Sequence, residues 1–170
     1  MAKARGFSET LVTIMPKYFA LSLFLFLSSA MAADFTVIDL DGHSQSLVAY
    51  RGKWIVVNFW ATWCPSCAGE IPDLNTFHRI HHAKDAVVLG LNFDDEVSDA
   101  ELKDFIRIHS IAYPMARATA AAVRALGAVT GLPTSYLVDP TGKVTARQLG
   151  PVTRIELEDF IRHHPIVYRE

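Results

Sequence analysis

Apolar residues along this chain gather in short runs rich in β-branched and aromatic side chains, separated by longer stretches with helical spacing. Trp54–Trp60 is a nearly unbroken apolar run, which is typical of a strand buried on both faces. Val87–Asn92 has the same character. Phe35–Leu40 alternates between apolar and polar residues, which predicts a short strand with one exposed face.

Signals for the starts and ends of helices mark four further segments. Pro65 suits a first helical turn because it has no N–H group to leave unpaired. Ser98 and Glu101 have the spacing of a capping box, and Gly127 is typical of a helix end. The expected helices cover residues 65–81, 98–108, 118–126 and 154–163.

Two further apolar runs, Ser135–Val138 and Val144–Leu149, flank the turn sequence Asp139–Lys143 and predict a hairpin. Strands and helices that alternate and finish in a hairpin and a helix indicate an α/β sandwich with a mixed sheet. Functional residues of such sheets usually lie just beyond the carboxyl ends of the strands. Residues 33–170 have the length of one ordinary domain.

Residues 1–32 have the pattern of an export signal. Basic residues precede the apolar run Tyr18–Leu27, and the small residues Ala30 and Ala32 follow it, which predicts cleavage directly after Ala32. The apolar run is shorter than the roughly 20 residues that span a bilayer. We therefore expect a cleaved signal peptide.

Two alternatives stay open at this end of the chain. An uncleaved leader would act as a marginal anchor in the inner membrane, and a start at Met15 instead of Met1 would give a more compact signal. In both cases the domain is expected in the periplasm or another extracytoplasmic, oxidising compartment. A formal net charge of −2 argues against a nucleic-acid partner, which would require a basic surface.

The only two cysteines stand together in Trp63-Cys64-Pro65-Ser66-Cys67. A disulfide between them closes too short a loop to stabilise the fold much, but the pair can carry two electrons. Structural zinc would need further ligands, and attachment of c-type haem would need His in place of Ala68. We predict no metal site, and we expect His78, His81 and His82, late in a helix, to be solvated.

Two segments resemble thioredoxin-fold proteins: Phe59–Cys67 resembles their active-site segment, and Gly131–Asp139 resembles the cis-proline loop that faces it. Three further features are similar to the exported TlpA-like branch, which includes the thiol reductants of cytochrome c maturation. They are Glu70-Ile71-Pro72 after the second cysteine, Asn58 where thioredoxin has a buried Asp, and an Asn92–Arg117 segment that resembles a central insertion.

The resemblance covers residues 35 to about 161. It implies a thioredoxin-like three-layer sandwich with a mixed central sheet and an α/β insertion. It also implies a thiol–disulfide oxidoreductase that reduces disulfides in other exported proteins, apocytochrome c among them. We expect no cofactor and a monomer, since nothing in the sequence indicates an obligate dimer. Because the compartment is oxidising, we expect the electrons to come from a membrane-bound donor. A disulfide oxidase or isomerase, and a metallochaperone that binds Cu(I) between the two thiolates, are alternatives.

Cys64 is predicted to be the attacking nucleophile, because a helix N-terminus lowers a thiol pKa from its usual value of about 8.5. Cys67, one turn further on, is expected to be the buried resolving thiol. Glu70 shares a helix face with Cys67. The resemblance implies that Glu70 is a buried acid that exchanges protons with the dithiol. The alternative is an ordinary Glu in the first part of the helix, where the helix dipole stabilises its negative charge.

The resemblance also implies a cis bond between Leu132 and Pro133. Such a turn would hold the backbone of Leu132 opposite the nucleophile, where it can pair with an extended substrate segment. Trp63, Pro65 and Pro133 are then expected to form an apolar rim for the partner. Trp54 and Trp60 are expected in the core.

Overall fold

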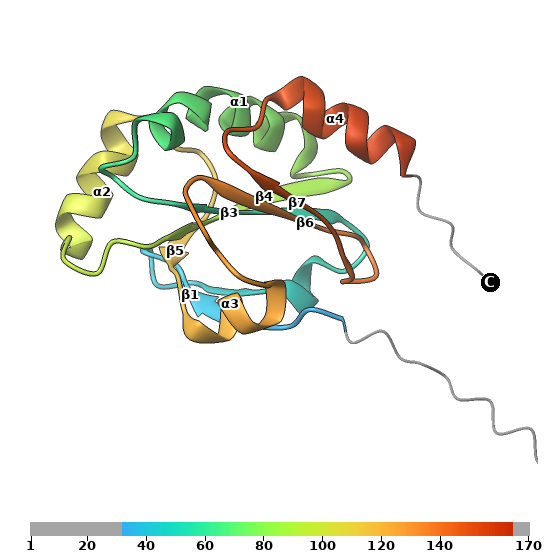
Figure 1. Ribbon diagram of the computed structural model, residues 1–170, viewed down its shortest axis with the longest axis horizontal. Coiled ribbons are helices and arrows are strands. Elements are labelled where there is room, and N and C mark those ends of the chain that lie inside the picture. Colours follow the sequence, from blue (N-terminus) through green and yellow to red (C-terminus); the bar gives the residue numbers. More distant parts are fainter. Residues whose placement is uncertain (1–31, 165–170) are drawn as a thin grey trace, which may run out of the picture.

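A five-stranded sheet lies between two layers of helices in the computed structural model, which describes residues 32–164 (Figure 1). The strand order is β5-β4-β3-β6-β7. The strands are β3 (Trp54–Trp60), β4 (Ala86–Asn92), β5 (Met115–Arg117), β6 (Thr134–Val138) and β7 (Val144–Leu149). The β3–β4 and β4–β5 pairs are parallel, and the β3–β6 and β6–β7 pairs are antiparallel. The predicted α/β sandwich with a mixed sheet is confirmed.

The helices and short strands divide between the two faces of this sheet. Figure 1 shows α1 and α4 above the sheet and α3 and β1 below it. The helices are α1 (Pro65–His81), α2 (Asp99–Ile108), α3 (Ala120–Leu126) and α4 (Arg154–His163). A small hairpin of β1 (Thr36–Ile38) and β2 (Ser44–Ser46) continues into the 3₁₀ helix Leu47–Tyr50. Among the helices of residues 32–164, none combines the length and apolar character needed to cross a membrane.

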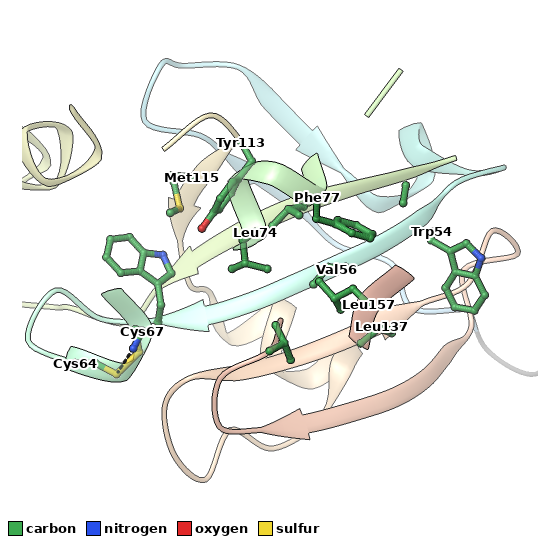
Figure 2. Packing of buried hydrophobic residues seen from close by; sticks show 14 of the residues in the cluster. Trp54, Val56, Cys64, Cys67, Leu74, Phe77, Tyr113, Met115, Leu137 and Leu157 are labelled. Atoms are coloured by element: carbon green, nitrogen blue, oxygen red, sulfur yellow. Dashed lines mark hydrogen bonds between the residues drawn. A yellow bond between two sulfur atoms is a disulfide. The ribbon is translucent and has the colours of Figure 1, made fainter. Parts of the chain in front are cut away.

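Side chains of β3 alternate between two hydrophobic clusters, one on each face of the sheet. Trp54, Val56 and Trp60 point into the cluster under α1 and α4, where Figure 2 shows Trp54 at one end and the cysteines at the other. Val57 and Phe59 point into the cluster on the opposite face. Because both faces are covered, all of β3 is buried, as the apolar run predicted. Trp54 and Trp60 are core residues, as expected.

The main elements confirm the predicted ranges: the bounds of β3, α1, β7 and α4 agree with them. Helix α3 begins at Ala120, two residues later than predicted, because the side chain of Thr119 caps it by accepting a hydrogen bond from the N–H of Ala122. The sequence does not predict β2 and β5. Each has three residues, too few to establish an alternating pattern.

The insertion between Asn92 and Arg117 joins the core at two places. Strand β5 extends the sheet beside β4, and the ring of Phe105 in α2 lies 5.0 Å from that of Trp60. Gly90 leaves room for the Met115 side chain of β5, because a Cβ atom at Gly90 would lie 2.1 Å from Sδ of Met115. The insertion is therefore part of the folded core.

His78 is buried, which corrects the expectation that it is solvated. Its Nδ1 accepts a hydrogen bond of 3.1 Å from the N–H of Val88. Strand β5 pairs with β4 only from Gly90 onward, so this N–H has no strand partner. Burial, aided by the positive charges of His82 and Lys53, lowers the pKa of His78 to about 4. Of the other two histidines that were expected to be solvated, His82 is exposed and His81 is partly buried beside Asp85.

We expect acid to destabilise the protein through His78. Because its folded pKa of about 4 lies below the ordinary 6.5, its contribution is complete above pH 6.5 and is lost as the pH falls toward 4. The full loss corresponds to about 3 kcal/mol. The variant His78→Asn, which keeps a hydrogen-bond acceptor but cannot be protonated there, should lose correspondingly less stability in urea denaturation between pH 7 and pH 4. His163→Asn, which alters an exposed ring, should behave like the wild type; equal losses in all three proteins would contradict this prediction.

Candidate active site

Cys64 and Cys67 form a disulfide where β3 ends and α1 begins, with an S–S distance of 2.16 Å (Figure 2). Cys64 is the N-cap of α1, and its Sγ accepts a hydrogen bond of 3.3 Å from the N–H of Cys67. The hydroxyl of Ser66 lies 3.4 Å from the same sulfur. When the disulfide is reduced, these donors and the helix dipole favour a thiolate at Cys64.

The surroundings of the two sulfur atoms differ. Cys67 is 1% exposed and lies within α1, whereas Trp63 and Pro65 on either side of Cys64 are exposed, Trp63 to 71%. Cys64 itself is 4% exposed in the disulfide form. The exposed residues of this site therefore flank Cys64, whereas Cys67 lies inside α1.

The peptide bond between Leu132 and Pro133 is cis, as the resemblance implied. Thr134, the next residue, pairs with Phe59 near the end of β3, so the cis-proline loop lies beside the segment that leads to Cys64. The N–H of Gly150 donates to the carbonyl of Pro133 and ties this loop to the end of β7. Pro133 is buried and Leu132 is partly buried.

Glu70 is 2% exposed and spans two layers of the fold. Its Oε1 accepts a hydrogen bond of 2.8 Å from Nδ2 of Asn58 in β3, and its Oε2 accepts one of 2.9 Å from the N–H of Val152 ahead of α4. The same Nδ2 of Asn58 donates to the hydroxyl of Ser135 in β6. Glu70 is therefore a buried acid, and not an exposed first-turn residue.

Burial raises the pKa of Glu70 to about 7, although the hydrogen bonds from Val152 and Asn58 act in the opposite direction. Glu70 lies three residues after Cys67 on α1, which places both on one helix face. A carboxyl group that titrates near neutral pH beside a dithiol can take up or release a proton during disulfide exchange.

Sequence reasoning missed two residues that shape this site, Asp94 and Arg117. The buried carboxylate of Asp94 accepts a hydrogen bond of 2.7 Å from the N–H of Thr62, just ahead of Cys64, and Arg117 binds the carbonyl of Asp94. One signal was available, since Asp94 follows a buried strand, where functional residues of α/β sheets gather. Within residues 32–164, no cluster of three or more His, Cys, Asp or Glu residues is arranged to hold a metal ion.

The family model for AhpC/TSA proteins matches residues 29–147, which includes the disulfide and the cis-proline loop. This chain belongs to the AhpC/TSA family. Thiol-disulfide oxidoreductase ResA of Bacillus thuringiensis subsp. konkukian is 31% identical to it over 131 residues, which are 77% of this chain and 75% of ResA. The similarity confirms the predicted class: this AhpC/TSA protein is a TlpA-like thiol–disulfide oxidoreductase.

Solved structures of other thiol–disulfide proteins share the fold of this AhpC/TSA-family chain. A thiol:disulfide interchange protein of Chlorobium tepidum TLS superimposes with a TM-score of 0.70 at 29% identity, covering 78% of this chain and 93% of its own. A secreted thiol-disulfide isomerase of Corynebacterium glutamicum gives 0.68 at 25% identity, covering 76% and 81%. The thioredoxin-like fold and the oxidoreductase class are thus confirmed, and disulfide-bearing proteins are the substrates of this class.

We expect the variant Glu70→Gln to stabilise the disulfide form above neutral pH. Because the folded pKa of about 7 lies above the ordinary 4.5, the contribution of Glu70 to stability is complete below pH 4.5 and is lost as the pH rises through 7. Relative to the variant, the wild type should lose about 3 kcal/mol of unfolding free energy between pH 4 and pH 8. Urea denaturation checks this. If the Asn58 amide reverses, it can satisfy the hydrogen bonds of both the Gln side chain and Ser135. Identical pH curves for the two proteins would show that folding does not change the pKa of Glu70, which would contradict this prediction.

Proposed function

We propose that this oxidoreductase works as a reductase of disulfides in other exported proteins, with Cys64 as nucleophile and Cys67 as resolving thiol. The observation that carries the proposal is the Cys64–Cys67 pair at the start of α1, with the neutral-range acid Glu70 on the same helix. Cys64 has an exposed neighbour on each side, whereas Cys67 lies inside the helix. Disulfide exchange needs this asymmetry between the attacking and the resolving thiol.

The reaction proceeds in two exchanges that transfer two electrons. The Cys64 thiolate attacks one sulfur of the partner disulfide, forms a mixed disulfide and releases the first partner thiolate. Cys67 then loses its proton to the carboxylate of Glu70 and attacks the sulfur of Cys64. The intramolecular disulfide forms, the second partner thiolate leaves, and the two partner thiolates take up protons from Glu70 and from solvent.

The surface around Cys64 is suited to an extended segment of the partner. Trp63 and Pro65 supply exposed apolar area beside Cys64, and the cis-proline loop contributes the partly exposed Leu132, while Pro133 itself is buried. Within residues 32–164, the backbone N–H and carbonyl of Leu132 form no hydrogen bond with the protein. These groups are free to pair with a partner strand, as in β-strand addition.

We also propose that the protein is exported and acts as a monomer in the periplasm or an equivalent extracytoplasmic space, with residues 33–170 as its thioredoxin-like domain. The pattern of residues 1–32 supports this, although residues 1–31 lie outside the described part of the chain. The C. glutamicum protein described above is a secreted one. In an oxidising compartment the dithiol must be regenerated, so we propose a membrane-bound electron donor, and apocytochrome c is among the expected substrates.

The packing of Ala33 supports the proposal that the domain begins at residue 33. Ala33 is buried and its N–H donates to the carbonyl of Gly142 in the β6–β7 turn, which lies near the start of β3. The disulfide lies at the other end of β3, about 20 Å away for a seven-residue strand. If the leader were retained as an anchor, the active site would therefore face away from the membrane.

The reduction potential of the Cys64–Cys67 pair decides the direction of electron flow. Equilibration of residues 33–170 with a thiol redox buffer at pH 7 should give a value near or below about −250 mV, as for reductants of the thioredoxin type. A value of about −120 to −180 mV would instead indicate an oxidase or isomerase. Cys64→Ser should abolish reduction of a disulfide substrate, and Cys67→Ser should accumulate the mixed disulfide on Cys64.

The variant Glu70→Gln should flatten the pH dependence of disulfide reduction between about pH 6 and pH 8, because the group that accepts the Cys67 proton is gone. The rate in this range should fall by about tenfold or more, since general bases contribute roughly 10²–10⁴-fold when fully effective. Glu96→Gln, which alters an exposed carboxylate, is the matched control and should keep the wild-type profile. An unchanged profile in Glu70→Gln would remove Glu70 from the mechanism.

Expression of the full chain with its leader tests export. Mass spectrometry of the protein from an extracytoplasmic fraction should find Ala33 as the first residue. An intact leader in the membrane fraction would favour the anchored form, and protein recovered only from the cytoplasm would contradict export.

A further inference from the structure

Asp94 connects the insertion to the loop that carries the nucleophile. It follows β4, is 4% exposed, and its Oδ2 accepts hydrogen bonds of 2.7 Å from the N–H of Thr62 and 2.8 Å from Nδ2 of Asn92. Thr62 is two residues before Cys64. The N–H of Phe93 also donates to the carbonyl of Trp60, so the two strand ends leave the sheet side by side.

The carboxyl group of Asp94 is charged at neutral pH despite its burial. Burial alone would raise the pKa of Asp94, but hydrogen bonds donated by Thr62, Asn92 and Trp63 outweigh it and hold the pKa below its usual value. A buried carboxylate is screened by salt much less than an exposed one. Asp94 therefore keeps a fixed negative charge behind the active-site loop.

Arg117 at the end of β5 fixes the position of that charge. Its guanidinium donates to the carbonyls of Asp94 and Val97 and pairs with the carboxylate of Asp99 at 2.9 Å. One rigid guanidinium group thereby holds two residues of the loop after β4 and the first residue of α2 beside the sheet edge. Because Arg117 binds the backbone carbonyl of Asp94, the carboxylate stays free to hold Thr62.

The Asp94 carboxylate is bound to the N–H of Thr62, two residues before Cys64, and a negative charge in the neighbourhood of a thiol disfavours the thiolate. Reduction of the disulfide creates that thiolate at Cys64, so the charge makes the dithiol form less stable relative to the disulfide. A less stable dithiol gives up its electrons more readily, which is what a reductase needs.

We propose that Asp94 is a positioning residue that holds the Thr62–Cys64 segment and, through its fixed charge, makes the Cys64–Cys67 dithiol a stronger reductant. The insertion between Asn92 and Arg117 then has a role in the chemistry, because it supplies both Asp94 and the arginine that secures it. The inference rests on the proposed roles of Cys64 and Cys67.

The test compares Asp94→Asn with Asp95→Asn in residues 33–170. Asp94→Asn keeps an acceptor for the N–H of Thr62 but removes the charge, and Asp95→Asn removes the same charge from an exposed neighbour. In glutathione buffer we expect Asp94→Asn to shift the dithiol–disulfide equilibrium about tenfold toward the dithiol. This corresponds to a reduction potential about 30 mV less negative than that of the wild type. The pKa of Cys64, measured by thiolate absorbance, should fall in parallel, and Asp95→Asn should match the wild type.

An unchanged potential in folded Asp94→Asn, or an equal shift in Asp95→Asn, would overturn the proposal. If Asp94→Asn does not fold, amide hydrogen exchange in the wild type still tests the contact: the N–H of Thr62 should be protected in both redox states, and rapid exchange would contradict it. Failure of the proposed function looks different, since the wild type itself would then have an oxidising potential or fail to reduce a disulfide substrate.

Discussion

Burial of the Glu70 carboxyl group between the sheet and α4 is the constraint on which the active site depends. Each of its oxygen atoms needs a donor, and one comes from Asn58 in β3 while the other comes from the backbone of Val152. The contact with β3 restrains the rotation of α1 above the sheet, and Cys67 lies on the same face of that helix, three residues before Glu70. One buried polar group thus aligns three elements that are far apart in sequence.

Two buried carboxyl groups near the dithiol differ in protonation because they differ in donors. Burial dominates at Glu70 and raises its pKa to about 7, whereas at Asp94 the donors of the active-site loop outweigh burial and keep the group ionised. Glu70 is thereby suited to moving a proton. Asp94 is suited to holding a segment of chain and a fixed charge.

The insertion shows how a short addition becomes part of a core. Strand β5 adds three residues to the sheet edge, and β4 continues beyond it, so the N–H of Val88 is left to the ring of His78. That contact requires a neutral histidine, and burial keeps the ring of His78 neutral by lowering its pKa to about 4. The same short strand ends in Arg117, which secures the loop of Asp94.

The sequence alone determined most of the architecture and the identity of the redox pair. Trp54–Trp60, the capping box at Ser98 and the turn at Asp139 are local signals, strong because each depends on a few adjacent residues. The paired cysteines and the loop around Pro133 indicated the chemistry in the same way.

Only the tertiary structure decided the states of the ionisable groups. In the sequence, His78 and Asp94 are ordinary polar residues of a helix end and a loop, and Glu70 was expected to be a buried acid only through the family resemblance. Their pKa values and partners depend on desolvation and on donors from other elements, such as the N–H of Val152, 82 residues from Glu70. Contacts at that separation leave no local pattern, because they arise only when packed layers exclude water and force buried polar groups to pair.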